Sequence, residues 1–138
     1  MHANVVDKRR ETINRHDAEA FAALYAADAV VTDPMYPEPL RGSEAVEKDI
    51  ADFVTAFPDL EASFARPILD GTKHAFEITM NGTHTGPLIG PDGEIPATNR
   101  TIELPVGVFA TLDEDGRIRE ERRYYDVASL LGQLGLTQ

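Results

Sequence analysis

The spacing of apolar positions divides the chain into a helical first part and a stranded second part. Residues 4–15, and a second stretch that Asp17 can cap, have the pattern of amphipathic helices. Ser43 is placed to cap a third helix, which Pro58 ends. The apolar residues of this third helix share one face: Val46, Ile50, Phe53, Val54 and Phe57.

After Pro58 the apolar positions alternate with polar ones, as in strands that bury a single face. Turn signals at Asp70-Gly71 and Asp115-Gly116, and a long loop rich in glycine and proline, separate the strands. A short helix over residues 127–134 closes the chain. Helices followed by such strands predict an α+β fold, in which a curved, mostly antiparallel sheet is wrapped by the N-terminal helices. A cavity between the two layers would be an apolar ligand pocket.

Length and composition limit the kinds of partner. The 138 residues fit a single domain, residues 1–138. The absence of cysteine excludes disulfides, thiol nucleophiles and cysteine-bound metals. Acidic residues outnumber basic ones by 24 to 13, and the formal charge of −11 argues against nucleic acid as a partner. Apolar runs are too short for a membrane span and no secretory signal is evident, so we expect a cytoplasmic protein.

The sequence lacks the common cofactor and nucleophile motifs. It contains no HExxH, no phosphate-binding loop, no GxSxG elbow and no GxGxxG fingerprint. The four histidines are scattered without metal-ligand spacing. We therefore expect neither a cofactor nor a metal, and any catalysis would use acid–base groups in an apolar pocket.

Asp126 and His84 are the two candidate catalytic residues. Counting in twos along residues 118–126 places Asp126 on the same strand face as the apolar Ile118. A carboxylate there would be partly desolvated and suited to proton transfer. Alternatively, Asp126 caps the last helix through Ser129. His84 has the parity of Met80 and would point inward, although a histidine in this turn can also be satisfied by a backbone carbonyl.

Candidate substrate-binding residues surround the predicted cavity. Asp33 and Tyr36 lie in a proline-stiffened loop that could form one wall, or they could simply stabilise its turns. Glu120–Arg123 has the pattern of solvated cross-strand ion pairs, with Arg122 as the exception because it shares the parity of Asp126. The remaining candidates lie on apolar or inward-facing positions: Phe53, Phe57, Met80 and Tyr124.

Several segments, taken in order, resemble the SnoaL-like branch of the nuclear-transport-factor-two superfamily across nearly the whole chain. They are residues 25–31 (YAADAVV), 37–42 (PEPLRG), 57–60 (FPDL), 82–86 (GTHTG), 116–118 (GRI), 124–126 (YYD) and 133–136 (QLGL). The resemblance implies a conical α+β barrel, paired into a homodimer through its sheet.

The resemblance also implies relatives that close rings of aromatic polyketides by intramolecular aldol condensation. In those cyclases an acid–base aspartate lies where Asp126 lies here, and a pocket role for His84 is implied as well. The cyclases carry a second histidine on the strand that here spans residues 104–109, which contains none. Stabilising an enolate oxygen would then fall to another group.

The leading interpretation is an enzyme that acts on a hydrophobic, carbonyl-bearing small molecule, such as an aromatic polyketide. Similar relatives take part in hydroxylation of polycyclic products, and other members of the superfamily open epoxides or isomerise steroids. Two alternatives therefore stay open. One is a hydroxylase or epoxide hydrolase of the same fold, and the other is a non-catalytic domain that only binds a small ligand.

Overall fold

The computed structural model describes residues 3–136. Within this range the helices are α1 (Ala3–Asn14), α2 (Ala18–Ala22), α3 (Ser43–Ala56) and α4 (Val127–Gln133). The strands are β1 (Tyr25–Thr32), β2 (Leu40–Arg41), β3 (Glu61–Asp70), β4 (Lys73–Thr83), β5 (Leu88–Gly90), β6 (Gly93–Ile95), β7 (Thr101–Leu112) and β8 (Ile118–Tyr124). Three helices, with β1 and β2 between the second and the third, come before the long strands β3, β4 and β7, as the apolar spacing predicts.

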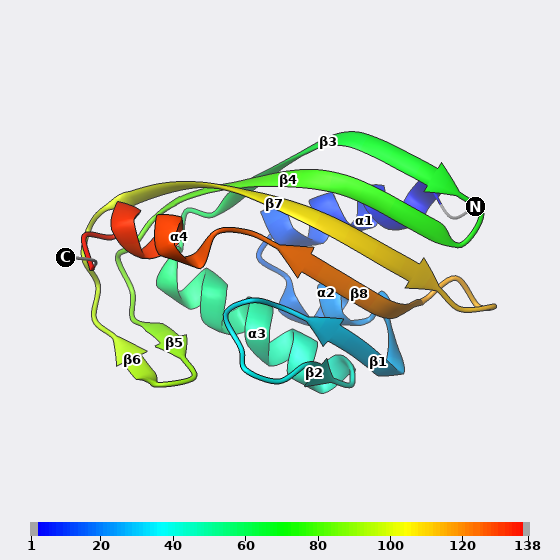
Figure 1. Ribbon diagram of the computed structural model, residues 1–138, viewed down its shortest axis with the longest axis horizontal. Coiled ribbons are helices and arrows are strands. Elements are labelled where there is room, and N and C mark those ends of the chain that lie inside the picture. The colour runs from blue at the N-terminus through cyan, green and yellow to red at the C-terminus, as the bar shows by residue number, and fades with distance from the viewer. Residues whose placement is uncertain (1–2, 137–138) are drawn as a thin grey trace.

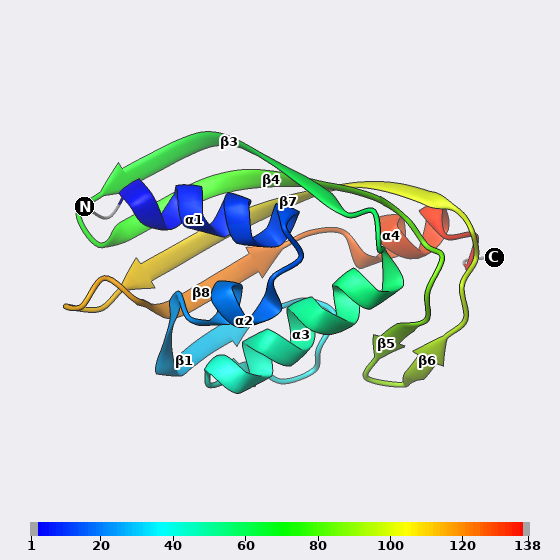
Figure 2. The ribbon, with the colours of Figure 1, turned by 180° about the vertical axis from the view of Figure 1, so that it is seen from behind.

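Six strands form one curved sheet in the order β2-β1-β8-β7-β4-β3. Only the β1–β8 pairing in this sheet is parallel. Helices α1, α2 and α3 lie across one face and leave the other uncovered (Figures 1 and 2). This arrangement confirms the predicted α+β class with a mostly antiparallel sheet. The loop predicted between β4 and β7 also contains a small separate hairpin, β5–β6.

Local signals explain most element ends. The Asp17 side chain accepts a hydrogen bond from the Ala20 amide and caps α2, as predicted. Gly71 has a φ of 61°, which fits the predicted hairpin turn between β3 and β4. The prediction of a Ser43 cap is wrong by one residue. Gly42 occupies the N-cap with a φ of 88°, a conformation that an L-residue rarely adopts, and Ser43 is already helical.

A bulge near the start of β8 sets which of its side chains face the helices. Leu112 of β7 pairs with Ile118, but Thr111 pairs with Glu120, so Arg119 is an extra residue on β8. Ile118 and Glu121 are therefore both buried, although they are three positions apart and would face opposite sides of a regular strand. An extra residue in a strand moves every following side chain to the opposite face. The inward side chains after the bulge are Glu121, Arg123 and Tyr125.

The core lies between the helices and the covered face of the sheet. Its residues include Val46 and Ile50 from α3, Ile78 from β4, and Val106 and Val108 from β7. No helix within residues 3–136 combines the length and apolar character needed to cross a bilayer.

Candidate active site

A cavity of about 100 Å³ lies between the covered face of the sheet and the helices. Its apolar wall contains Ile78, Met80, Leu104, Val106 and Val108 from the sheet, Ile13, Phe21, Ile50 and Phe53 from the helices, and Leu88 and Ile89 from the β5–β6 hairpin. Its charged and phenolic lining residues are Arg9, Asp33, Tyr36, Asp49, Asp52, Glu121, Arg123 and Tyr125. The site therefore combines an apolar chamber with a cluster of ionisable groups on one wall.

Arg123 lies at the centre of this cluster. Its Nε donates to Glu121 Oε2 over 2.7 Å, and its Nη1 is 3.0 Å from Asp33 Oδ2 and 2.8 Å from Asp49 Oδ2. Its Nη2 makes no hydrogen bond to any group among residues 3–136, and the Arg123 side chain is 13 % exposed. A guanidinium fixed on two sides thus keeps one nitrogen free to donate to a ligand oxygen.

Glu121 joins Arg123 to a second buried arginine. Glu121 Oε1 accepts hydrogen bonds from Arg9 Nη2 and, over 2.8 Å, from the Tyr25 hydroxyl. The Arg9 guanidinium also lies over the rings of Tyr25 and Phe76, 5.5 and 4.9 Å from their centroids. Arg9 is 2 % exposed and Glu121 is 1 % exposed. This pair attaches α1 to β8 at the wall of the cavity.

Charge neutralisation dominates the acid–base properties of Glu121. Burial alone would raise the pKa of its carboxyl group, but the guanidiniums of Arg9 and Arg123 lower that pKa to about 2. Glu121 is therefore a permanent anion near neutral pH. It balances cations and does not suit proton exchange.

The two phenols on the wall are held neutral. Tyr36 donates to Asp49 Oδ1 over 2.7 Å, and Tyr125 donates to Asp33 Oδ1 over 2.5 Å. Burial, followed by the charge of the carboxylate that each phenol contacts, raises the pKa of both hydroxyl groups. Both tyrosines are thus hydrogen-bond donors at neutral pH.

Four predicted substrate-binding residues lie in the cavity lining: Asp33, Tyr36, Phe53 and Met80. Asp33 also accepts from the Met35 amide over 2.9 Å, so it both stabilises its turn and contributes to the wall. The prediction that Phe57 binds the substrate is wrong. It follows the last turn of α3, is fully buried, and packs against Phe53 and His84 outside the lining of the cavity.

Asp126 is placed differently from the inward position predicted for it. It is exposed, lies outside the cavity lining, and accepts a hydrogen bond from the Ser129 amide over 3.1 Å as the N-cap of α4. The physical reason is the bulge at Arg119, because counting in twos from Ile118 assumes that the alternation is unbroken. The helix-cap alternative describes the observed geometry.

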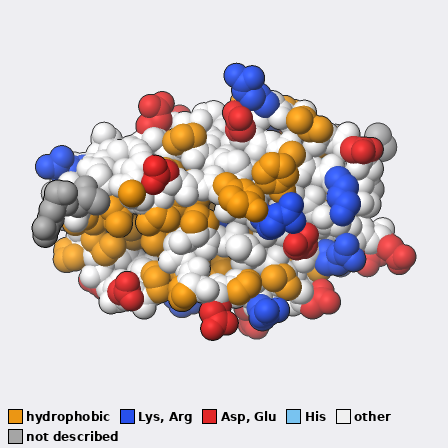
Figure 3. All heavy atoms as spheres, in the orientation of Figure 1, with side chains coloured by type: hydrophobic (Ala, Val, Ile, Leu, Met, Phe, Trp, Pro, Cys, Tyr) orange, Lys and Arg blue, Asp and Glu red, His pale blue; other side chains and the backbone are white. Residues whose placement is uncertain are grey.

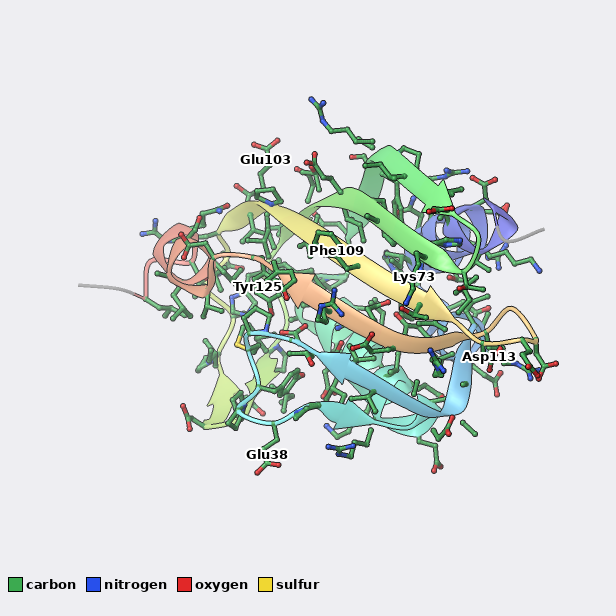
Figure 4. All side chains as sticks on the ribbon, turned by 45° about the vertical axis from the view of Figure 1, so that its right-hand side comes forward. Glu38, Lys73, Glu103, Phe109, Asp113 and Tyr125 are labelled. Atoms are coloured by element: carbon green, nitrogen blue, oxygen red, sulfur yellow. The ribbon has the colours of Figure 1, made fainter. Side chains whose placement is uncertain are left out.

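The predictions that Arg122 and Tyr124 bind the substrate are wrong for the same reason. Both point to the uncovered face of the sheet, where Tyr124 is 57 % exposed. The Arg122 guanidinium lies 5.8 Å from the ring centroid of Phe109 and pairs with Glu120. Figure 4 labels Phe109 on this face, and Figure 3 shows hydrophobic side chains gathered over the same strands. The homodimer through the sheet stays a prediction.

His84 is buried behind the cavity and does not line it. Its Nδ1 accepts from the Thr98 amide over 3.2 Å and lies 3.0 Å from the Thr98 hydroxyl, while its backbone bonds to Asn99 and Arg100. Burial lowers the pKa of the imidazole, which favours the neutral ring. The prediction that His84 faces the pocket is therefore corrected: it ties together the two ends of the loop that carries β5 and β6.

The sequence reasoning missed six polar residues of the lining: Arg9, Asp49, Asp52, Glu121, Arg123 and Tyr125. Arg9 carried a usable signal, since it shares a helix face with Val6 and Ile13, three before and four after. An arginine on an apolar face predicts a buried carboxylate partner. Asp49 precedes the apolar Ile50 and gave no such signal.

The site is thus an apolar cavity with two carboxylates sharing one guanidinium. A model of the SnoaL-like polyketide cyclases matches residues 3–134. The chain belongs to the SnoaL-like polyketide cyclase family. No protein of known, curated function matches it.

Solved structures support the same fold. IdmH of Streptomyces antibioticus, a candidate polyketide cyclase, is 26 % identical, with a TM-score of 0.77 over 98 % of this chain and 99 % of that one. A candidate SnoaL-like cyclase from Jannaschia sp. CCS1 is 16 % identical, with a TM-score of 0.83 over 99 % and 93 % of the two chains. AclR of Streptomyces galilaeus, a candidate hydroxylase, is 19 % identical, with a TM-score of 0.81 over 99 % and 82 %.

These relatives share a fold while their names point to different reactions. The chemistry of this chain must therefore be argued from its own cavity. Among residues 3–136 no three His, Asp or Glu side chains gather in a way that could hold a metal ion. The groups available for chemistry in the described cavity are the carboxylates, guanidiniums and phenols of its polar wall.

Proposed function

We propose that this protein is a cofactor-independent acid–base enzyme that closes a ring in a hydrophobic, carbonyl-bearing small molecule such as an aromatic polyketide. The observation that carries the proposal is the pairing of Asp49 with Arg123 on the wall of an apolar cavity. It sets a carboxylate that can accept a proton beside a guanidinium nitrogen that can hold the resulting oxyanion.

Asp49 suits the role of base better than Asp33. Asp33 accepts three hydrogen bonds, from Tyr125, the Met35 amide and Arg123. Asp49 accepts only two, from Tyr36 and Arg123, and the Asp49 side chain is 17 % exposed against 6 % for Asp33. Asp49 therefore has fewer of its lone pairs occupied by protein donors, and its carboxylate is the more accessible of the two to a substrate.

In the proposed reaction Asp49 removes a proton from a carbon next to a carbonyl group. The electron pair of that C–H bond moves to the carbonyl oxygen, where Arg123 Nη2 donates to the enolate. The enolate carbon then attacks a second carbonyl of the same molecule, which forms a C–C bond and an alkoxide. The alkoxide takes the proton back from Asp49, so substrate and product have equal mass. The Arg123 donor thereby fills the role of the strand histidine that residues 104–109 lack.

The apolar chamber favours a substrate with little charge, because burying a charged group without a partner is costly. At about 100 Å³ the cavity is smaller than a polycyclic molecule requires. A substrate of that size would have to displace side chains of the lining, such as those of Met35, Phe53 and Ile89. Smaller carbonyl compounds would need less rearrangement.

A second reaction, the opening of an epoxide by water, is favoured by the contact between the Tyr36 phenol and Asp49. A neutral phenol beside a carboxylate supplies an acid for the epoxide oxygen and a base for the water. The product would then gain one molecule of water. Hydroxylation would add an oxygen atom, and a domain that only binds a ligand would leave its mass and structure unchanged.

The experiment is to incubate the protein with a panel of aromatic poly-β-ketones, their esters and related epoxides, and to follow product mass and ring structure by mass spectrometry and NMR. We expect a product of unchanged mass with a new ring. Asp49→Asn should lower its rate at least 100-fold, since a general base contributes about 100- to 10 000-fold.

Asp126→Asn is the matched control, because asparagine also caps helices well and Asp126 lies outside the cavity. This variant should keep the wild-type rate. Ring closure at an unchanged rate in Asp49→Asn would contradict the assignment of the base. Tight binding with no product across the panel would favour the binding domain instead.

A further inference from the structure

The charged groups on the polar wall of the cavity form a row of alternating sign. Arg9 contacts Glu121, Glu121 contacts Arg123, and Arg123 Nη1 contacts both Asp33 and Asp49. With all groups ionised, the three carboxylates exceed the two guanidiniums by one charge. The excess negative charge falls at the cavity end of the row, where two carboxylates share one nitrogen.

We propose that Arg9 and Glu121 are positioning residues, which act through Arg123 to set the pH range in which Asp49 is ionised. Glu121 accepts a hydrogen bond from Arg123 Nε, whereas Asp49 accepts one from Nη1 of the same guanidinium. Arg9 of α1 donates a hydrogen bond to the other carboxylate oxygen of Glu121, Oε1. Each residue thus changes how much of the Arg123 charge is available to Asp49. The consequence for catalysis rests on the proposed function, whereas the electrostatic coupling does not.

The two residues act in opposite directions. The negative charge of Glu121 disfavours a second negative charge on Asp49 and competes for the same guanidinium. Removing that charge should stabilise the Asp49 carboxylate and make it a weaker base. The positive charge of Arg9 offsets Glu121, so removing it should increase the negative field at Asp49 and make Asp49 easier to protonate.

Other charged and titratable groups also face Asp49, and the variants leave them in place. Arg123 comes from β8, and Asp33 and Tyr36 come from the segment between β1 and β2. On α3 itself Lys48 pairs with Asp52, which lines the same cavity. Tyr125, after β8, binds Asp33. Their contributions are common to the wild type and every variant, so differences in titration report on Arg9 and Glu121.

The test is a pH titration of the Asp49 side-chain carboxyl carbon by ¹³C NMR in the full-length protein, without substrate. We expect the midpoint in Glu121→Gln to move to lower pH and that in Arg9→Met to move to higher pH, each by about 0.5 pH or more. Glu120→Gln and Arg10→Met remove the same charges from exposed neighbours and should leave the midpoint unchanged. A purely structural role does not predict shifts of opposite sign.

A buried charge without its partner can prevent folding. The double variant Arg9→Met/Glu121→Gln leaves neither charge behind and should return the midpoint to within about 0.3 pH of wild type, because a dipole's field falls faster than a charge's. Midpoints that shift in the same direction in both single variants would overturn the proposal. So would an unshifted midpoint in Glu121→Gln together with a double variant whose midpoint equals that of Arg9→Met.

The same variants separate this inference from the proposed function. If Asp49 is the base, the acidic limb of the pH–rate profile follows the NMR midpoint in each variant. An NMR midpoint that moves while the rate profile stays in place supports the coupling and contradicts Asp49 as the base. A midpoint that stays in place while Asp49→Asn abolishes turnover overturns the coupling and leaves the proposed function standing.

Discussion

Residues 120–125, which comprise the end of β8 and the residue after it, place one glutamate, one arginine and one tyrosine on each face of the sheet. The surroundings of the two sets differ entirely. The uncovered face presents Glu120, Arg122 and Tyr124, and the covered face presents Glu121, Arg123 and Tyr125. On the uncovered face, Arg122 and Glu120 form a solvated pair 3.4 Å apart. On the covered face, Arg123 makes three close charged contacts in the wall of a cavity. Residue type alone therefore does not identify the site.

The difference follows from the solvent. Water already stabilises an exposed ion pair's separate charges, so such a pair contributes about 0–1 kcal/mol. A buried charge has lost that water and depends on its protein partners, which makes the loss of one partner costly. The paired residues at 120–125 offer matched variants that differ in environment and in little else.

The largest contrast is expected between Arg123→Met and Arg122→Met. Arg123→Met leaves Glu121, Asp33 and Asp49 without their shared cation and should lower the free energy of unfolding by about 3–5 kcal/mol. Arg122→Met should change it by about 0–1 kcal/mol. Urea denaturation at neutral pH measures both. Equal effects would mean that the two faces do not differ in the way described.

A smaller contrast is expected in the acid stability of Glu121→Gln and Glu120→Gln. Arg9 and Arg123 lower the pKa of Glu121 from 4.5 to about 2, so its ionised form stabilises the fold above pH 4.5. That stabilisation should be lost as the pH falls from about 4.5 to about 2. Thermal melts across this range should show a steeper decline for wild type and Glu120→Gln than for Glu121→Gln. Parallel curves would contradict the assignment.

The smallest contrast is expected between Tyr125→Phe and Tyr124→Phe. Tyr125→Phe removes a hydrogen bond to the Asp33 carboxylate, which is worth about 1.5–3 kcal/mol. The Tyr124 hydroxyl lies on the exposed face, and its removal should leave the unfolding free energy within about 0.5 kcal/mol of wild type. Calorimetric melting of both variants measures the difference. A Tyr125→Phe variant as stable as Tyr124→Phe would contradict the stabilising role given to the Tyr125–Asp33 hydrogen bond.

The sequence predicted the parts of the fold that depend on regular spacing. The apolar stripe of α3 and the alternation in β4 and β7 are each set by many residues, so one irregular position does not hide them. Asp33 and Tyr36 were found because three prolines confine their loop to a fixed path. These signals predicted both the apolar chamber and one polar residue pair on its wall.

The rest of the site depends on a single extra residue. Arg119 changes the face on which Glu121 and Arg123 lie, and no strong propensity marks it as a bulge. Residues 120–125 are Glu-Glu-Arg-Arg-Tyr-Tyr, so the odd and the even positions carry the same three residue types and do not reveal which set faces inward. Asp126 and Arg122 were chosen by that count, and both lie outside the cavity.

The repetition of each residue type at 120–125 also has a consequence for how the chain folds. A β7–β8 hairpin that closed from its turn without the bulge would present Glu120, Arg122 and Tyr124 to the helices, with the same chemistry as the native set. Local contacts within the strand hardly distinguish the two registers, so the choice between them must come from its neighbours, including Leu130 and the Asp126 cap of α4. We therefore expect a slipped hairpin to compete with the native register during folding, and such a hairpin would have to unpair before α4 can dock.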